Sequence, residues 1–389
     1  MPPLPDPLAH LPAPPPEAAE ISARLQARIR AGIEAAGWLT FAQYMELALY
    51  SPGLGYYSAG STKLGAEGDF ITAPELSPLF ARCLARQLGE LLGWGIPDVI
   101  ELGAGSGALA ADLLTALAAG GRLPERYRIL ELSADLRQRQ RATLDARAPA
   151  LAARVEWLDV LPPELDAVVV ANEVLDAMPT HVIRARGGEI DELGVALAAD
   201  GALKPAWRPA GGELLRTARA LALPDGYQTE INLAARALTK VLGRRLGRGA
   251  FVFVDYGFPA AEYYHPQRSS GTLMCHYRHH AHPDPFVLIG LQDITAHVDF
   301  TAIATAGVDA GLRVLGYATQ AQFLINTGIT EALSETPASD VRAYASLAAQ
   351  AQKLLSPAEM GELFKVLALG KGIDEPLIGF SRGDRTHTL

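Results

Sequence analysis

The chain has 389 residues, of which 49% are hydrophobic and 20% are charged, and its formal net charge is −9. This length fits two domains or one α/β domain with large insertions, and the hydrophobic share predicts a sizeable core. The negative charge argues against a nucleic-acid partner, because proteins bind phosphate backbones with basic faces. The 2 cysteines lie far apart in the sequence and predict no disulfide framework.

The composition of the N-terminal residues predicts no targeting segment. The first twenty residues contain no Lys or Arg, and they match neither a secretory signal nor an organelle transit peptide. No apolar run approaches the length of a membrane span, so we expect no direct membrane insertion. We predict a cytoplasmic protein with a disordered, Pro-rich lead-in over 1–20 and a disordered tail over 381–389.

Helical periodicity appears on both sides of a long loop near the N-terminus. Apolar residues recur at every fourth position from Ile21 to Ile33, which predicts an amphipathic helix. The stretch 51–75 is rich in Gly, aromatic and small polar residues, and ordered loops of this length usually carry function. Residues 76–93 return to a helical pattern, and we assign 21–95 to an N-terminal cap.

A strand, a glycine turn and a helix follow one another from Asp98. Val99 and Ile100 form the apolar strand, and Glu101 closes it. The turn then comprises Gly103, Ala104, Gly105, Ser106 and Gly107. An Ala- and Leu-rich helix over 108–117 follows and is ended by Gly120–Gly121. This order predicts the first unit of a nucleotide-binding α/β sheet, whose glycines let the backbone approach a ligand.

The glycine turn alone leaves the ligand open. GAGSGA fits both the dinucleotide fingerprint and the G-x-G-x-G turn of S-adenosylmethionine (SAM) enzymes. Glu101 favours SAM over NAD, because a carboxylate repels a pyrophosphate but suits a sulfonium and an ammonium. The structural alternative is a glycine turn that packs a helix onto a sheet without a ligand.

Two further strands, over 127–132 and 155–158, end in residues that could flank the same ligand. Glu131 closes the first of them, where sheets of this kind hold a ribose diol; alternatively it is a surface residue or a helix cap. Trp157 either flanks an adenine ring or packs in the core.

A fully apolar strand over 166–171 delivers Asn172, Glu173 and Asp176 to its carboxyl end. Ligands of open parallel sheets lie outside these ends, so the three side chains are candidate catalytic groups. On a helical turn Glu173 and Asp176 share a face, and paired carboxylates can grip a guanidinium and leave one nitrogen nucleophilic. The structural alternative is a helix N-terminus, where acidic residues stabilise the dipole.

The remaining chain predicts insertions and the closing strands of the sheet. Residues 181–209 alternate in polarity, as in an antiparallel hairpin, and 250–254 form a buried strand followed by Asp255 and Tyr256. Further elements are expected as a helix over 231–242, strands over 312–315 and 364–369, and helices over 320–327 and 340–354. The predicted parts are a catalytic domain over 96–182 and 248–370, a hairpin and helix insertion over 183–247, and a polar insertion over 259–310.

A histidine-rich stretch lies in the polar insertion. It contains Cys275, His276, His279, His280 and His282. Their spacing matches no standard zinc pairing, and a second ligand pair is not evident. We therefore predict a polar loop and no metal site.

Several segments together resemble one family, the SAM-dependent methyltransferases of the MidA type. The matching pieces are YMELALYSPGLGYY (44–57), GAEGDFITAPELSPLF (65–80), VIELGAGSG (99–107), ANEVLDAMP (171–179), FVDYG (253–257), DITAHVDF (293–300), TQAQFLINTGI (319–329) and FKVLALG (364–370). They occur in order between about residue 35 and about residue 380. The resemblance implies a class I methyltransferase fold, with a Rossmann-like, seven-stranded, mostly parallel sheet, an N-terminal cap and insertions.

The resemblance also implies roles for individual residues. Its SAM-binding positions fall on Glu101, Gly103, Gly105, Gly107 and Glu131, and we count Ala104, Ser133 and Trp157 with them. Asp69, Phe70, Thr72 and Pro74 belong to a loop that is expected to close over the cofactor. Asn172, Glu173 and Asp176 are expected to face the substrate, with Asp255, Tyr256 and His280 as further substrate-binding candidates.

The family includes a mitochondrial complex I assembly factor that methylates an arginine of a core subunit. The resemblance therefore implies SAM-dependent methylation of an arginine in a protein substrate, a subunit of respiratory NADH dehydrogenase (complex I), and support of its assembly. One alternative is an assembly chaperone that binds SAM but catalyses little, and another is an NAD-dependent oxidoreductase. The intact Glu101, glycines and N-E-x-x-D segment argue against an inactive enzyme.

Overall fold

The computed structural model describes residues 11–59, 72–337 and 339–389. The chain divides into two compact units, each assembled from three segments. The first unit comprises Met1–Phe70, Asp176–Ala234 and Tyr264–His297. The second comprises Ile71–Leu175, Ala235–Tyr263 and Val298–Leu389.

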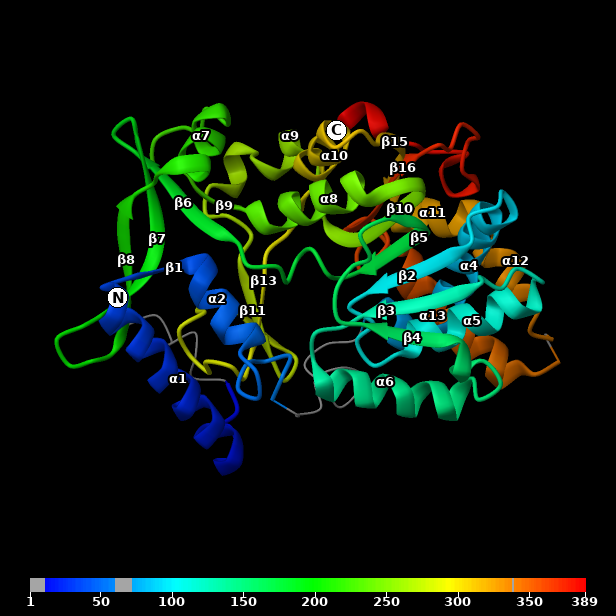
Figure 1. Ribbon diagram of the computed structural model, residues 1–389, viewed down its shortest axis with the longest axis horizontal. Helices are drawn as coiled ribbons and strands as arrows, with labels where there is room; N and C mark the ends of the chain where they lie inside the picture. The colour runs from blue at the N-terminus through cyan, green and yellow to red at the C-terminus, as the bar shows by residue number, and fades with distance from the viewer. Residues whose placement is uncertain (1–10, 60–71, 338) are drawn as a thin grey trace. The chain divides into compact units, whose positions relative to one another are not determined.

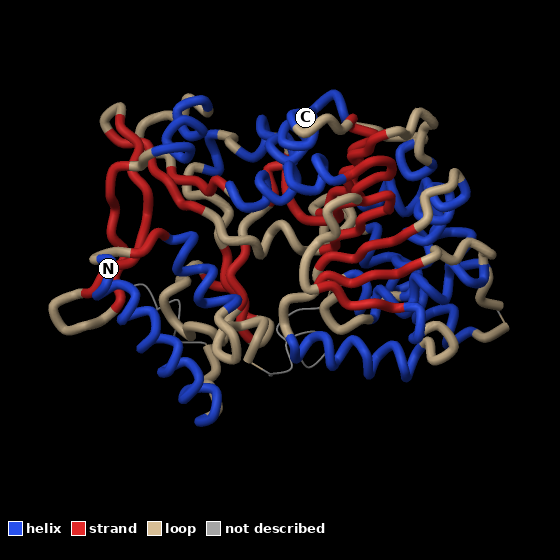
Figure 2. The backbone as a smooth tube through the Cα atoms, in the orientation of Figure 1, coloured by secondary structure: helices blue, strands red, loops and turns tan. Residues whose placement is uncertain are grey.

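The second unit is built on a mixed sheet whose strands run side by side in Figures 1 and 2. Its strands are β2 (Asp98–Leu102), β3 (Arg126–Leu130), β4 (Val155–Leu158), β5 (Leu165–Asn172), β10 (Leu246–Phe258), β14 (Val298–Asp299), β15 (Arg313–Thr319) and β16 (Phe364–Lys371). Their order is β15-β16-β10-β5-β2-β3-β4, and β14 pairs with β10. Neighbours from β4 to β10 are parallel, whereas β16 runs antiparallel to β10 and β15. The parallel strands therefore present their carboxyl ends at the same end of the sheet.

The two faces of this sheet have different neighbours. Ala250 and Val252 of β10 join a core cluster that includes Leu88, a residue of the helix over Pro78–Gly93. Because side chains alternate along a strand, Phe251 points to the opposite face, together with its cross-strand neighbour Leu369. The sheet is thus buried on both sides, which explains the continuous apolar runs of its central strands.

Helices cover both faces of the sheet (Figure 1). They are α3 (Ala73–Leu76), α4 (Pro78–Gly93), α5 (Ala108–Ala119), α6 (Ala134–Arg147), α8 (Leu233–Arg245), α9 (Ala260–Tyr263), α10 (Phe300–Asp309), α11 (Gln320–Asn326), α12 (Ile329–Ser334) and α13 (Val341–Leu355). α4 and α5 bury leucines in the cluster that contains Val252. α10 lies on the other face, where Gly307 closely approaches Leu369. α5 ends as predicted, with Gly121 at a φ of 64° and the Arg122 N–H bonded to the Leu117 carbonyl.

The first unit combines two antiparallel sheets with helices. Its elements are α1 (Pro16–Ala36), α2 (Phe41–Tyr50), α7 (Gly212–Ala220), β1 (Leu39–Thr40), β6 (His181–Arg186), β7 (Glu189–Leu197), β8 (Leu203–Pro209), β9 (Gln228–Ile231), β11 (Met274–Tyr277), β12 (His280–His282) and β13 (Asp293–Thr295). One sheet has the order β1-β7-β6-β9 with β8 on β7, and the other has the order β12-β11-β13. The antiparallel pairing of β6, β7 and β8 agrees with the alternating polarity of 181–209.

The apolar spacing of α1 determines its buried face. Leu25, Ile29 and Ile33 are buried at intervals of four residues, and they join a core with residues of α2. The helix ends at Gly37, whose φ is 73° and whose N–H donates to the Ile33 carbonyl.

The structure corrects the two predicted disordered ends. α1 begins at Pro16, a residue type suited to the first helical turn, so helix occupies part of the expected lead-in. The tail is ordered because it is bonded to β15: Asp384 accepts the Tyr317 N–H at 3.0 Å, and the Arg385 N–H donates to the Tyr317 carbonyl at 2.6 Å. Residues 1–10 lie outside the described residues.

The histidine-rich stretch also differs from the expected polar loop. Residues 274–282 form a hairpin in which Tyr277 pairs with His280. Arg278 and His279 occupy the turn with φ values of 46° and 63°, as a two-residue turn between twisted strands requires.

The expected division of the chain also differs. Residues 73–93 belong to the second unit and not to an N-terminal cap, because α4 packs its apolar face against the sheet. Among the residues that the structure describes, no helix has both the length and the apolar character that crossing a membrane demands.

Candidate cofactor and substrate site

The turn between β2 and α5 requires glycine for two separate reasons. Gly107 has a φ of 85°, a left-handed conformation that L side chains rarely adopt. A Cβ atom at Gly107 would also lie 2.9 Å from Cα of Gln140 on α6. The Gly107 N–H closes the turn on the Ala104 carbonyl at 2.8 Å. The turn therefore brings bare backbone to the carboxyl end of β2, at the start of a helix.

Glu101 is the last but one residue of β2 and is 2% exposed. The Tyr127 hydroxyl donates a hydrogen bond of 2.6 Å to its Oε2. Burial raises the pKa of Glu101 to about 7, the Tyr127 hydrogen bond opposes this shift, and the neighbouring charge of Glu131 adds to it. The carboxyl group therefore changes charge near neutral pH and would be held ionised by a cationic ligand.

Glu131 follows β3 and is also buried, with both carboxylate oxygens engaged by neutral donors. The Ser133 N–H donates to Oε1 at 3.0 Å, and Nε2 of Gln140 donates to Oε2 at 3.0 Å. Burial raises the pKa of Glu131 above its ordinary value, although these two hydrogen bonds oppose the shift. Ser133 also caps α6, since its Oγ accepts the Leu136 N–H at 3.3 Å. Ser133 thus orients Glu131 through its backbone, while its side chain begins the helix.

Two apolar side chains lie exposed just after neighbouring strands of the sheet. Leu132 is 78% exposed and Val160 is 74% exposed, and they follow the neighbouring strands β3 and β4. Trp157, by contrast, packs against the core and donates its indole N–H to Oε1 of Gln140 at 2.9 Å. The exposed pair was missed by the sequence reasoning. An apolar residue directly after a strand-end carboxylate was the available signal.

These features together fit SAM better than a dinucleotide. Two buried carboxylates accept hydrogen bonds from neutral groups, so a bound cation and a ribose diol would supply the remaining partners. The exposed Leu132 and Val160 offer an apolar surface to a base. A pyrophosphate beside Glu101 and Glu131 would meet repulsion.

The segment that begins at Thr72 contacts the glycine turn. Glu75 of α3 accepts a hydrogen bond from the Ser106 hydroxyl. Pro74 is buried, and Thr72 precedes α3 without a side-chain cap. Asp69 and Phe70 lie outside the described residues. Glu75, which the sequence reasoning did not single out, therefore ties this segment to the turn.

The turn after β5 is strained and not helical. Glu173 has a φ of 53°, which excludes the helical turn expected for Glu173 and Asp176, and with it the alternative of a helix N-terminus. The Glu173 N–H donates to the Val254 carbonyl at 2.9 Å, and the Asn172 amide donates to Oε1 of Glu173 at 3.0 Å. The structure thus brings Asn172 and Glu173 together at the end of β5.

Asp255 stabilises this turn. It is 1% exposed, and its Oδ2 accepts the Leu175 N–H at 2.9 Å while its Oδ1 accepts the Tyr256 N–H at 3.0 Å. Its expected role was substrate binding, but these contacts are those of a residue that shapes the backbone. Tyr256 packs edge-to-face on Phe364, with ring centroids 5.4 Å apart.

Asp176 belongs to the first unit, where it is 5% exposed. Nearby, the Tyr57 hydroxyl donates to Asp293 at 2.9 Å, and the Tyr50 ring stacks on Tyr57 at 5.4 Å. Burial raises the pKa of Tyr57, and the charges of Asp293 and Asp176 raise it further. Two carboxylates and two aromatic rings therefore form one cluster in this unit, which we call the acidic–aromatic cluster (Tyr50, Tyr57, Asp176, Asp293). His280 lies in the same unit, with its Nδ1 2.7 Å from the Arg278 carbonyl oxygen of its own hairpin.

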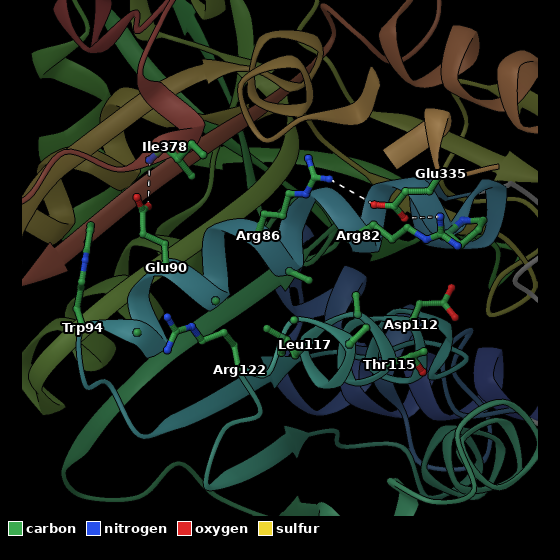
Figure 3. A pocket seen from close by; sticks show the side chains of 17 residues that line it. Arg82, Arg86, Glu90, Trp94, Asp112, Thr115, Leu117, Arg122, Glu335 and Ile378 are labelled. Carbon is green, nitrogen blue, oxygen red and sulfur yellow. Dashed lines mark hydrogen bonds and ion pairs between the residues drawn. The ribbon is translucent and has the colours of Figure 1, made fainter. Parts of the chain in front are cut away.

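A groove of about 880 Å³ lies elsewhere in the second unit, along α4 and α5. None of the candidate site residues lines it. Arg82 and Arg86 are directed at Glu335 (Figure 3), and their ion pairs with it measure 3.5 and 3.6 Å. Glu90 accepts the Ile378 N–H at 3.0 Å. Arg82 and Arg86 thus share Glu335, whereas Glu90 is bonded to the backbone near the C-terminus.

The mixed sheet with helices on both faces, and the carboxylates at its strand ends, define an α/β methyltransferase fold. A family model described as "Putative S-adenosyl-L-methionine-dependent methyltransferase" matches residues 80–318. The chain belongs to this family. It is similar to a Burkholderia thailandensis protein solved in a crystal structure bound to S-adenosyl-homocysteine (SAH), with 53% identity and a TM-score of 0.94 over 97% of this chain and 100% of that chain. The protein is thus a SAM-dependent methyltransferase.

Curated relatives lie further away in sequence. The Drosophila melanogaster "Protein arginine methyltransferase NDUFAF7 homolog, mitochondrial" is 28% identical over 95% of this chain and 92% of its own length. The Mus musculus "Protein arginine methyltransferase NDUFAF7, mitochondrial" is 28% identical over 87% of this chain and 82% of its own length. The prediction of a cytoplasmic protein is contradicted by these relatives, which are named as mitochondrial proteins.

Proposed function

We propose that this methyltransferase acts on an arginine side chain of a protein substrate, a subunit of respiratory NADH dehydrogenase (complex I). The observation that carries the acceptor is the Asn172–Glu173 turn, which presents a carboxylate at the end of β5. This is the same end of the sheet at which Glu101 and Glu131 lie. The two NDUFAF7 proteins named above are called protein arginine methyltransferases, which agrees with such an acceptor.

The cofactor contacts that we propose follow from the strand ends. Glu101 faces the positively charged part of SAM, Glu131 accepts from the ribose hydroxyls, and the turn over 103–107 approaches the ligand with its backbone. Leu132 and Val160 lie beside the base. The strand order, with the antiparallel β16 between β10 and β15, supports the class I, Rossmann-like assignment within this mixed sheet.

When bound, SAM supplies a methyl group on a positively charged sulfur, which makes that carbon electrophilic. The chain's own residues must hold the acceptor nitrogen and remove a proton, because methylation replaces one N–H bond by an N–C bond. A guanidinium has a pKa above about 12 and is a poor nucleophile. Glu173, oriented by the Asn172 amide, localises the positive charge away from the acceptor nitrogen and accepts the proton that leaves it.

The acidic–aromatic cluster supports a basic protein substrate. Its carboxylates Asp176 and Asp293 are buried, and its tyrosine rings stack. Carboxylates and aromatic faces are the groups that recognise arginine and lysine side chains. The cluster therefore suits a basic segment of the substrate protein.

Labelled SAM tests the proposal. We would incubate the protein with labelled SAM and a lysate of a strain that lacks it, and identify methylated residues by mass spectrometry. We expect label on an arginine of a complex I subunit with the wild type, and none with Glu173→Gln, which should still bind SAH. Label on a small molecule, or on residues other than arginine, would contradict the proposed acceptor. Normal complex I assembly with Glu173→Gln would instead indicate a chaperone.

A further inference from the structure

Gln140 interrupts an otherwise simple helix pattern. α6 is a polar helix whose buried positions are Leu136, Gln140 and Leu144, spaced by four residues. Gln140 is 0% exposed, so an amide occupies a position that the pattern would give to an aliphatic side chain. A buried amide is stable only when its donors and acceptor are satisfied, so its partners explain why it is there.

The amide of Gln140 bonds to two segments that follow β2 and β3 and to a side chain of the neighbouring strand β4. Its Nε2 donates to the Gly105 carbonyl at 3.1 Å and to Oε2 of Glu131 at 3.0 Å. Its Oε1 accepts the Trp157 indole N–H at 2.9 Å. Because an indole nitrogen can only donate, Trp157 fixes which end of the amide is oxygen and aims the NH₂ group at Glu131 and the glycine turn.

This arrangement orients Glu131 from two sides. Gln140 holds Oε2, and the Ser133 N–H holds Oε1. A carboxylate oxygen accepts more than one hydrogen bond, so each oxygen keeps capacity for a ligand hydroxyl. The same NH₂ group anchors the Gly105 carbonyl, and the Gln140 backbone lies where a Cβ at Gly107 would be placed. One residue thus sets both the ribose acceptor and the glycine turn.

We propose that Gln140 is a positioning residue for the cofactor site, which couples the glycine turn, Glu131 and Trp157 and so controls the affinity for SAM and SAH. It touches no ligand itself and acts through Glu131 and Gly105. The inference rests on the proposed contact between Glu131 and the ribose. It gives α6 a role in cofactor affinity, in addition to the roles of the glycine motif and of the strand-end carboxylates.

The first test compares two buried glutamines of the same unit. Gln87 on α4 is also 0% exposed; it accepts the Gly379 N–H at 2.9 Å and donates to Glu90 at 2.8 Å. We would measure the SAH dissociation constant by calorimetry and the melting temperature of the full chain for Gln140→Leu and Gln87→Leu. Both should lower the melting temperature, but only Gln140→Leu should weaken SAH binding, by about 10- to 100-fold, the usual effect of losing a hydrogen bond to a charged group. Equal SAH affinity in both variants would overturn the proposal.

A second variant gives a readout that a structural role alone would not move. Gln140→Glu still accepts from Trp157, but when ionised it places a second carboxylate against Glu131. The other charged groups around it are Glu101 at the end of β2, and Arg137 and Arg141 on α6. We expect the SAH affinity of Gln140→Glu to rise as pH falls, relative to the wild type, because a protonated Glu at this position again donates to Glu131. A pH profile parallel to that of the wild type would count against the proposal.

Two further controls separate this inference from the proposed function. Failure of the wild type to bind SAH would reject the cofactor assignment itself. If Glu131→Ala loses SAH binding while Gln140→Leu and Gln140→Glu bind within about twofold of the wild type, the site stands and the role of Gln140 is rejected.

Discussion

The turn after β2 and the turn after β5 lie at the same end of one sheet. Each contains residues with a left-handed backbone, but these are glycines in the first turn and Glu173 in the second. After β2, glycines adopt it at little cost, and neighbouring backbone excludes a side chain at Gly107. After β5, Glu173 adopts it with a full side chain and is held there by hydrogen bonds to β10. The first turn leaves its backbone uncovered by side chains, and the second holds a carboxylate in a strained position.

Replacing Gly107 by Ala should have the largest effect. The new Cβ would meet Cα of Gln140 at 2.9 Å, and a side chain at a φ of 85° is itself strained. We expect a loss of about 3 kcal/mol in the free energy of unfolding and loss of SAH binding. Denaturant titration and calorimetry measure the two effects. Gly120→Ala is the matched control, since φ there is −81° and its nearest neighbour would lie 3.5 Å away; equal effects at both glycines would contradict the steric argument.

Glu101→Gln should change how stability depends on pH. Burial raises the pKa of Glu101 from 4.5 to about 7, so between these values the folded protein holds a proton that the unfolded chain has released. The free energy of unfolding therefore falls as pH rises through this window, by up to about 3 kcal/mol. The Gln variant lacks this loss, so we expect its stability relative to the wild type to increase from about pH 5 to about pH 8. Denaturation of the ligand-free protein across this range measures it, and a constant difference would contradict the shift.

Asp255→Asn probes the contacts that hold the turn after β5. The amide keeps one acceptor oxygen, so either the Leu175 or the Tyr256 N–H loses its partner. We expect the free energy of unfolding to fall by about 1–2 kcal/mol and methyl transfer to fall at least about tenfold, with SAH affinity within about twofold. Asp166→Asn is the control, because Asp166 accepts the Arg248 N–H at the opposite end of the β5–β10 pair. Similar losses of transfer in both variants would reject a specific role for Asp255.

The smallest effect on stability should come from the strain at Glu173. Glu173→Ala and Glu173→Gly both remove the carboxylate, but only Gly adopts a φ of 53° without strain. We expect the Gly variant to be more stable than the Ala variant by about 1 kcal/mol, with both unable to transfer methyl groups. Chemical denaturation resolves this difference. Equal stability of the two variants would mean that the backbone at this position relaxes when the side chain is lost.

Sequence reasoning predicted the elements better than the contacts between distant segments. The strand at 99–101, the turn over 103–107 and the helix that follows are local, since glycines and apolar periodicity specify them within a few residues. The expected helical turn for Glu173 and Asp176 was wrong because Val254 and Asp255, far along the chain, bond the backbone that a helix would use. Gln140 was missed for the same reason, since its three partners lie on three separate segments.

The sequence by itself determined the family, the SAM-dependent chemistry and the positions of Glu101, Glu131 and the glycine turn, because these depend on short motifs and on strand-end spacing. Only the tertiary structure decided that burial raises the pKa of Glu101 to about 7, that Glu173 lies in a strained turn and that Asp255 shapes that turn. The physical reason is that desolvation, strain and buried hydrogen bonds arise where segments distant in the chain meet, and local sequence does not encode that meeting.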